Sequence, residues 1–132
     1  MNFHKPNNIF EYMRLFALYN RAFPISEKKP ISMILKMEKC GATDVWYFEE
    51  GGEFLGLAIT INSPELILVD YFAVSKKLRG RGNGERMLKA LISHYTGKVY
   101  SLRSRDSMRM QKTTRTASVV ADFIRKGWGW FR

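Results

Sequence analysis

The strongest constraint on the fold is one segment in which an apolar run passes through a glycine-rich turn directly into an amphipathic helix. Residues 66–74 are apolar apart from Asp70, which predicts a strand buried on both faces. Basic and glycine residues follow over 75–84, and from residue 85 apolar side chains recur at helical spacing until Gly97. The segment therefore predicts a strand, a loop and a helix in immediate succession.

A loop of this kind favours an anion. Glycines let the backbone turn its N–H groups outward, and the N-terminus of the following helix adds the positive end of a dipole. Arg79 and Arg81 add two positive charges, so a diphosphate is the expected ligand. The loop lacks the Gly-Lys-Ser/Thr ending of a nucleotide P-loop. It also lacks the first glycine of a Rossmann fingerprint, three residues before Gly82, so both motifs are excluded.

Hydrophobic periodicity places the other elements. The expected order is helices over 9–20 and 30–40, strands over 45–48, 54–61 and 66–74, and a helix over 85–95. The residues expected on the inner face of the first helix are Ile9, Met13, Phe16 and Ala17. Beyond Gly97 a strand is expected over 99–102 and a helix over 117–126, while residues 103–116 show neither period.

Composition narrows the class of protein. With 132 residues, 45% of them hydrophobic and 26% charged, the chain suits a single globular domain. A single cysteine, Cys40, excludes an internal disulfide and a cysteine-based zinc site. His4 and His94 stand at no recognisable ligand spacing, so no metal site is predicted. No apolar run is long enough to span a membrane and no signal peptide is visible, so we expect a cytoplasmic protein.

The net charge of +10 is unevenly distributed. Residues 98–132 hold nine Lys/Arg and two Asp/Glu, so +7 of the charge lies in the last quarter of the chain. A basic chain raises nucleic acid as a partner. However, the Arg-Gly pairs at 79–82 stand alone and belong to no repetitive tract, so nucleic acid is the less favoured partner.

The segment around the glycines resembles the GNAT superfamily of N-acetyltransferases. Arg79, Gly82 and Gly84 match its signature Gln/Arg-x-x-Gly-x-Gly/Ala, between a buried strand and an amphipathic helix. The resemblance extends over about residues 9–95 and includes the order of the elements. It implies an α/β fold with a mixed β-sheet flanked by helices, and residues 1–97 form its acetyl-CoA-binding core.

The resemblance also implies a binding mode. The residues whose backbone would hold the pyrophosphate of acetyl-CoA are Arg79, Gly80, Arg81, Gly82, Asn83 and Gly84. The residues that would pair with the pantetheine arm, as a neighbouring strand would, are Phe72, Ala73 and Val74. A backbone N–H there would polarise the thioester carbonyl, and an amine of a small molecule or peptide would attack it.

The catalytic base is assigned to Asp70, which lies near the end of the central strand. The alternative is that this carboxylate is an ordinary structural hydrogen-bond acceptor, as many strand-end carboxylates are. Both interpretations stay open at this point.

Residues 98–132 depart from the family pattern, and we interpret them as an atypical basic tail, not a separate domain. The tyrosine that protonates the departing thiolate in this family has no counterpart here. One hypothesis is a frameshift near Gly97 or Lys98, and the other is a divergent tail that binds an acidic partner. The predicted function is N-acetyl transfer from acetyl-CoA. The alternatives are an impaired acetyl-CoA-binding remnant and a small nucleic-acid-binding protein. Domains of this kind can form homodimers.

Overall fold

The computed structural model describes residues 1–62, 66–78, 80–95, 99–103 and 110–113. In this part of the chain, six strands form one sheet in the order β1-β2-β3-β4-β5-β6. The strands are β1 (Asn2–His4), β2 (Thr43–Glu50), β3 (Glu53–Asn62), β4 (Leu66–Val74), β5 (Val99–Arg103) and β6 (Met110–Thr113). Only β4 and β5 pair in parallel, so the sheet is mixed, as expected from the sequence.

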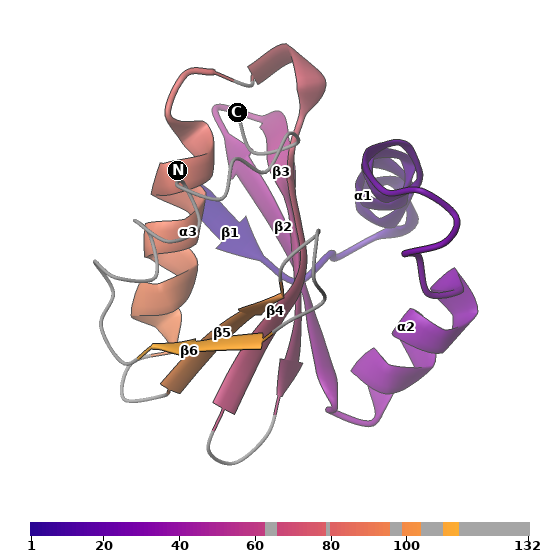
Figure 1. Ribbon diagram of the computed structural model, residues 1–132. Coiled ribbons are helices and arrows are strands. Elements are labelled where there is room, and N and C mark those ends of the chain that lie inside the picture. Colours follow the sequence, from indigo (N-terminus) through magenta and orange to yellow (C-terminus); the bar gives the residue numbers. More distant parts are fainter. Residues whose placement is uncertain (63–65, 79, 96–98, 104–109, 114–132) are drawn as a thin grey trace.

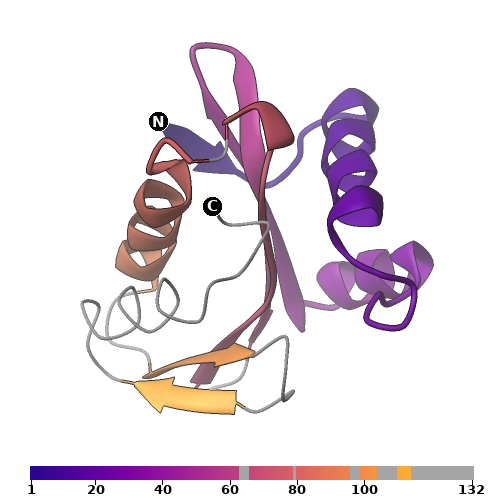
Figure 2. The ribbon, with the colours of Figure 1, turned by 45° about the horizontal axis from the view of Figure 1, so that its top comes forward.

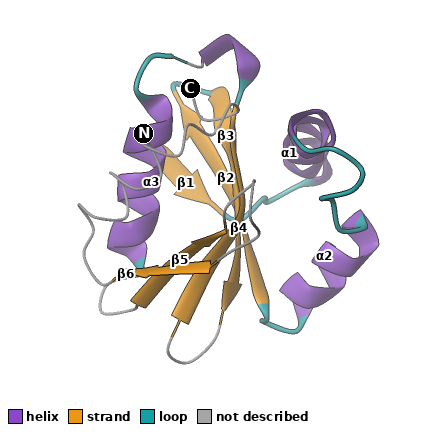
Figure 3. Ribbon diagram, viewed as in Figure 1, coloured by secondary structure: helices purple, strands orange, loops and turns teal. Residues whose placement is uncertain are grey.

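Helices cover both faces of the sheet (Figures 1 and 3). On one face lie α1 (Ile9–Ala22) and α2 (Ile31–Lys39), and on the other lies α3 (Asn83–His94). A short 3₁₀ turn, η1 (Lys76–Leu78), follows β4. The expected elements over 9–95 are therefore confirmed with small shifts of their ends. Within the described residues, no helix is long and apolar enough to cross a membrane.

The inner face of α1 differs from the one expected. Ile9 and Met13 are 69% and 61% exposed, whereas Leu15, Leu18 and Tyr19 are buried against β3 and β4. Helix α1 has apolar residues on two faces, and the sheet packs against the face that carries Leu15, Leu18 and Tyr19. Of the four residues expected on the inner face, Phe16 is buried as predicted, whereas Ile9, Met13 and Ala17 are exposed, so the predicted face is wrong at three of its four positions.

A β-bulge interrupts the pairing of β3 with β4. Ile59 pairs with Tyr71, but the next residue, Thr60, pairs with Val69, so Asp70 is the extra residue on β4. A bulge of this kind re-aims side chains and bends the strand. As a result, Asp70 and Tyr71 both contact the loop between α1 and α2.

Within the described residues, strand β5 pairs with only the first half of β4. The parallel register runs from Leu66 opposite Val99 to Val69 opposite Leu102, and β4 continues to Val74. Figure 2 shows β5 and β6 at one end of β4, with the glycine-rich connection to α3 at the other. The strand expected from residue 99 is confirmed as β5. The helix expected over 117–126 lies outside the described residues.

Helix α3 is fixed to the sheet at its C-terminal end. Tyr95 follows its last residue, and its hydroxyl donates to Oδ2 of Asp44 at 2.5 Å and accepts from Nε1 of Trp46 at 3.0 Å. Burial, reinforced by this bond to Asp44, raises the pKa of the Tyr95 hydroxyl above its usual value. The apolar residues of α3 that are buried are Met87, Leu88, Leu91 and Ile92. Packing and this anchor together set the position of the helix N-terminus.

Candidate functional site

The glycine loop, defined as residues 79–84, runs from the end of η1 into the first turn of α3. Arg79 lies outside the described residues. Gly80 and Gly82 have φ of 80° and 77°, in the left-handed region that favours glycine, and a Cβ at either would meet nothing within 4 Å. Gly82 is the N-cap of α3. Glycine therefore stands at two loop positions where the backbone is left-handed.

The loop has the features of an anion site. The first turn of a helix leaves backbone N–H groups without intrahelical partners, and the helix dipole places positive potential there. Gly82 is solvent-exposed, and Arg81 beside it is an exposed cation. A phosphate group can approach this backbone closely, because Gly80 and Gly82 carry no side chains.

The side chain of Asn83 points into the protein. It is 7% exposed, and its Nδ2 donates to the carbonyl oxygen of Leu78 at 3.1 Å. This bond spans the loop from η1 to the first residue of α3. The side-chain amide of Asn83 therefore supports the loop from within.

The last three residues of β4 are buried as whole residues, main chain and side chain alike. Phe72, Ala73 and Val74 are fully buried, and they pair with Ala58, Leu57 and Gly56 of β3. Their side chains form part of the core between the helices. A ligand pairing with this end of β4 would therefore have to reach backbone groups that are buried in this structure.

Asp70 lies at the bulge with its side chain 1% exposed. Nζ of Lys29, in the loop between α1 and α2, donates to Oδ2 of Asp70 and neutralises its charge. The same loop is held by Tyr71, whose hydroxyl donates to the carbonyl oxygen of Glu27 at 2.6 Å and accepts from the backbone N–H of Lys29 at 3.1 Å. Sequence reasoning selected Asp70 but not Lys29, which lies 41 residues away in the chain.

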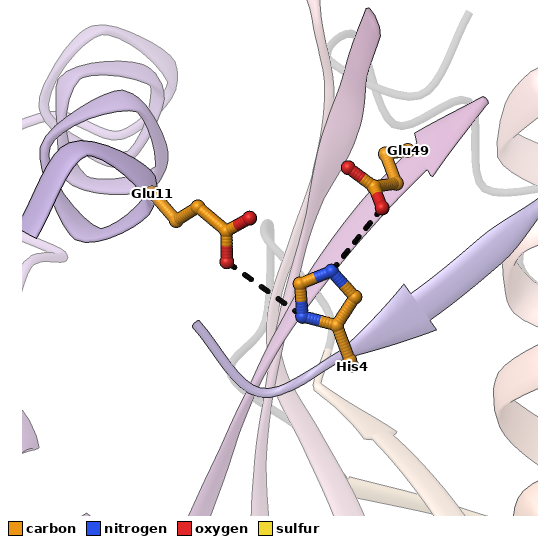
Figure 4. A group of neighbouring side chains, drawn as sticks. All are labelled: His4, Glu11 and Glu49. Carbon is orange, nitrogen blue, oxygen red and sulfur yellow. Dashed lines mark hydrogen bonds and ion pairs between the residues drawn. The ribbon is translucent and has the colours of Figure 1, made fainter. Parts of the chain in front are cut away.

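Among the described residues, one group could be considered for a metal ion: His4, Glu11 and Glu49 (Figure 4). The two carboxylates approach different ring nitrogens, since Nδ1 is 3.7 Å from Glu11 and Nε2 is 3.3 Å from Glu49. Nδ1 also lies 2.8 Å from the carbonyl oxygen of Lys5. This carbonyl and the two carboxylates raise the pKa of the His4 imidazole. The geometry suits a protonated imidazole that joins β1, β2 and α1, and we assign the group this electrostatic role.

A separate apolar hollow of about 680 Å³ lies between α1 and α2. Its lining includes Tyr12, Phe16 and Leu35, and the hydroxyl of Tyr12 donates to Glu38 at 3.0 Å across it. Because it involves the N-terminal end of α1 and the C-terminal end of α2, it lies away from the loop of Lys29. None of its lining residues belongs to the glycine loop or to β4.

Comparison with known proteins identifies the family. The family model of the acetyltransferase (GNAT) family matches residues 12–110. The fold is similar to an acetyltransferase of the GNAT family from Bacteroides thetaiotaomicron, with 18% identity, a TM-score of 0.73, and coverage of 96% of this chain and 71% of that one. It is also similar to an acetyltransferase from Bacillus subtilis solved in complex with CoA, with 13% identity, a TM-score of 0.59, and coverage of 96% and 73%. No curated protein sequence matches the chain.

These likenesses carry different weight. At 18% and 13% identity, the two solved structures support the fold alone. The family match covers α1 from Tyr12, both central hairpin strands, β4, the glycine loop, α3 and β5. It thus contains every element that builds the candidate site. The chain belongs to the acetyltransferase (GNAT) family.

Proposed function

We propose that this chain transfers an acetyl group from acetyl-CoA to an amine of a small molecule or peptide. The observation that carries the proposal is the geometry of the glycine loop, in which two left-handed glycines lead into the N-terminus of α3, an arrangement that favours an anion. Membership of the family and the CoA named for the Bacillus subtilis structure support an acyl-CoA as the donor. The acetyl group and the amine acceptor belong to the proposal.

In the proposed binding mode, the pyrophosphate of acetyl-CoA lies against the backbone of residues 79–84, beside Arg81. The pantetheine arm follows the last residues of β4, Phe72 to Val74, along their backbone. A backbone N–H in this stretch polarises the thioester carbonyl and stabilises the oxyanion that forms during attack. The loop thus fixes the donor, and β4 orients its reacting carbonyl.

The chemical step needs a neutral amine. The amine nitrogen forms a bond to the carbonyl carbon, the bond from that carbon to sulfur breaks, and the thiolate leaves and takes up a proton from water. We assign the proton lost by the amine to Asp70, directly or through water. In the structure the ammonium of Lys29 is ion-paired with this carboxylate. The acceptor would have to displace Lys29 from Asp70 as an ammonium group and then give up a proton to become the neutral amine that attacks.

Product analysis tests the proposal. The chain is incubated with acetyl-CoA and a panel of amines, and acetylated products are detected by mass spectrometry, which avoids thiol reagents that would react with the exposed Cys40. We expect an acetylated amine, and a rate about 10²-fold lower or more for Asp70→Asn with acetyl-CoA binding retained. If Asp70→Asn transfers acetyl at the wild-type rate, the base is another group.

Binding and product assays on the same purified chain also distinguish two alternative functions. An impaired remnant would bind acetyl-CoA and give no product with any amine. A nucleic-acid-binding protein would bind duplex or single strands with an affinity that falls steeply as salt is raised, and would not prefer acetyl-CoA to free nucleotides. A cytoplasmic location and a homodimer stay predictions from the sequence.

A further inference from the structure

A chain of polar side chains ties the glycine loop to the tip of the β2–β3 hairpin. Asn83 donates to the carbonyl oxygen of Leu78 at 3.1 Å and accepts from Nη1 of Arg86 at 3.0 Å. Arg86 in turn makes a forked contact with Glu50, at 2.6 Å from Nη2 to Oε2 and 3.3 Å from Nη1 to Oε1. We call Glu50, Arg86 and Asn83 the brace.

The brace spans parts of the molecule that are distant in the sequence. Glu50 is the last residue of β2, 36 positions before Arg86 in α3. Asn83 joins this surface pair to the buried side of the loop, because its own side chain is 7% exposed. A shallow cavity of about 310 Å³ lies beside the brace, and its lining also includes Glu53, Leu55 and Arg81. The brace therefore connects the glycine loop to the sheet through side-chain hydrogen bonds as well as through the backbone.

The loop needs such support for a physical reason. Gly80 and Gly82 are the residues with the greatest conformational freedom, and a Cβ at either position would meet nothing within 4 Å. Side-chain packing therefore does little to restrict these positions. A loop that is ordered before it binds loses less entropy on binding, and its affinity is correspondingly higher.

We propose that the side chains of Glu50, Arg86 and Asn83 have a positioning role: they hold the glycine loop in its anion-binding shape and do not themselves touch the anion. The inference rests on the proposed function for its ligand, acetyl-CoA, but the shape of the loop can be tested without any ligand. Removing any member of the brace loosens the loop and weakens acetyl-CoA binding.

Electrostatics alone predicts the opposite sign for Glu50. Removing a negative charge beside an anion site strengthens anion binding, the more so because Glu50 also neutralises the N-terminal ammonium at 3.2 Å. The brace predicts weaker binding for Glu50→Ala. Glu53→Ala is the matched control, because it removes the same charge from the same cavity, and none of the hydrogen bonds of the brace involves Glu53.

Arg86→Lys separates position from charge in the same way. Lysine keeps the positive charge but has no planar fork, so it cannot hold Glu50 and Asn83 together as the guanidinium does. The brace therefore predicts that Arg86→Lys is impaired almost as much as Arg86→Ala. Lys89→Gln is the control on the same helix, because it breaks the Lys89–Glu85 ion pair at 3.1 Å and leaves the loop untouched.

The experiment combines two measurements on the intact chain. Hydrogen exchange of residues 76–84, without ligand, reports the order of the loop, and titration with acetyl-CoA reports its affinity. For Asn83→Ala we expect faster exchange and about tenfold weaker binding, which corresponds to about 1.4 kcal/mol. For Glu50→Ala and Arg86→Lys we expect faster exchange and severalfold weaker binding. Glu53→Ala and Lys89→Gln should exchange as wild type does, with binding unchanged or tighter for Glu53→Ala and unchanged or slightly weaker for Lys89→Gln.

The outcomes are separable. Unchanged loop exchange in Asn83→Ala and Glu50→Ala refutes the brace, whatever the chain does with acetyl-CoA. Tighter acetyl-CoA binding by Glu50→Ala, equal to that of Glu53→Ala, refutes it as well. If wild type fails to bind acetyl-CoA but the brace variants still exchange faster, the positioning role stands and the proposed function fails.

Discussion

Replacing Gly56 with alanine tests how closely β3 and β4 approach at the end of β4 that we assign to the donor. A Cβ on Gly56 would lie 2.3 Å from the carbonyl oxygen of Ala73, 2.8 Å from Cε of Met87 and 3.1 Å from Cα of Val74. The Met87 methyl can rotate away. The carbonyl oxygen belongs to the paired strand, and carbon–oxygen contacts lie at about 3.3 Å or more, so β4 must move by about 1 Å.

The expected cost follows from this displacement. Overpacking that shifts the backbone costs about 1–3 kcal/mol, and this site belongs at the upper end because a backbone atom is hit. Alanine recovers about 0.4–1 kcal/mol by restricting the unfolded chain. We therefore expect Gly56→Ala to lower the free energy of unfolding by about 2 kcal/mol. For a domain of this size, the midpoint of thermal unfolding would fall by roughly 5–12 °C.

The assay is urea and thermal unfolding followed by circular dichroism. Gly51→Ala is the control, because a Cβ there meets nothing within 4 Å and only the φ of 60° is unfavourable, at about 1 kcal/mol. Gly56→Ala should be clearly the less stable of the two, and it should also weaken acetyl-CoA binding, since Ala73 is displaced. A Gly56→Ala variant as stable as Gly51→Ala would refute the packing argument.

Two further predictions concern charged groups. Lys29→Met removes the ammonium that pairs with the buried carboxylate of Asp70, so it should lower the free energy of unfolding by about 1–3 kcal/mol. The double variant Lys29→Met/Asp70→Asn should recover part of this loss. Urea unfolding at pH 7 measures both variants, and a Lys29→Met variant as stable as wild type contradicts this prediction. The Lys5 carbonyl and nearby carboxylates such as Glu49 raise the pKa of His4, so its stabilising contribution is present below pH 6.5 and is lost as pH rises through the raised pKa. Wild type should therefore exceed His4→Gln in stability by more at pH 5.5 than at pH 8.5, and a constant difference contradicts this.

The unit from β4 to α3 was predictable because its signals are local. An apolar run, the glycines at 80, 82 and 84, and helical periodicity each depend on neighbours within a few residues. The same segment carries the family resemblance. The fold of the glycine loop and of the elements on either side of it was therefore predictable from the sequence alone.

The parts that were missed depend on tertiary packing. Strand β1 has only three residues, which give no usable period, and it forms by pairing with β2. The bulge at Asp70 is a matter of register with β3, which no single strand encodes. The face of α1 was misjudged because two sets of apolar residues fit the helical period equally well. Ile9 and Met13 belong to the exposed set, and Leu15 and Leu18 belong to the buried set.

Long-range polar contacts were equally invisible. Glu50 and Arg86 are 36 residues apart, and nothing in either segment indicates the other. Asn83 was selected as a backbone contact of a ligand, but the inward direction of its side chain depends on the conformation of the loop. Side-chain partners of this kind become visible only when the fold is known.

The central claim, that the glycine loop and the end of β4 bind acetyl-CoA, is tested most directly by thermal unfolding with and without this ligand at near-physiological salt. A ligand at about 100 times its dissociation constant stabilises the folded state by about 2.7 kcal/mol, which raises the unfolding midpoint by several degrees. We predict this rise with acetyl-CoA, a much smaller one with ADP, and a reduced one for Gly82→Ala. A cooperative unfolding transition that acetyl-CoA leaves unchanged would contradict the claim.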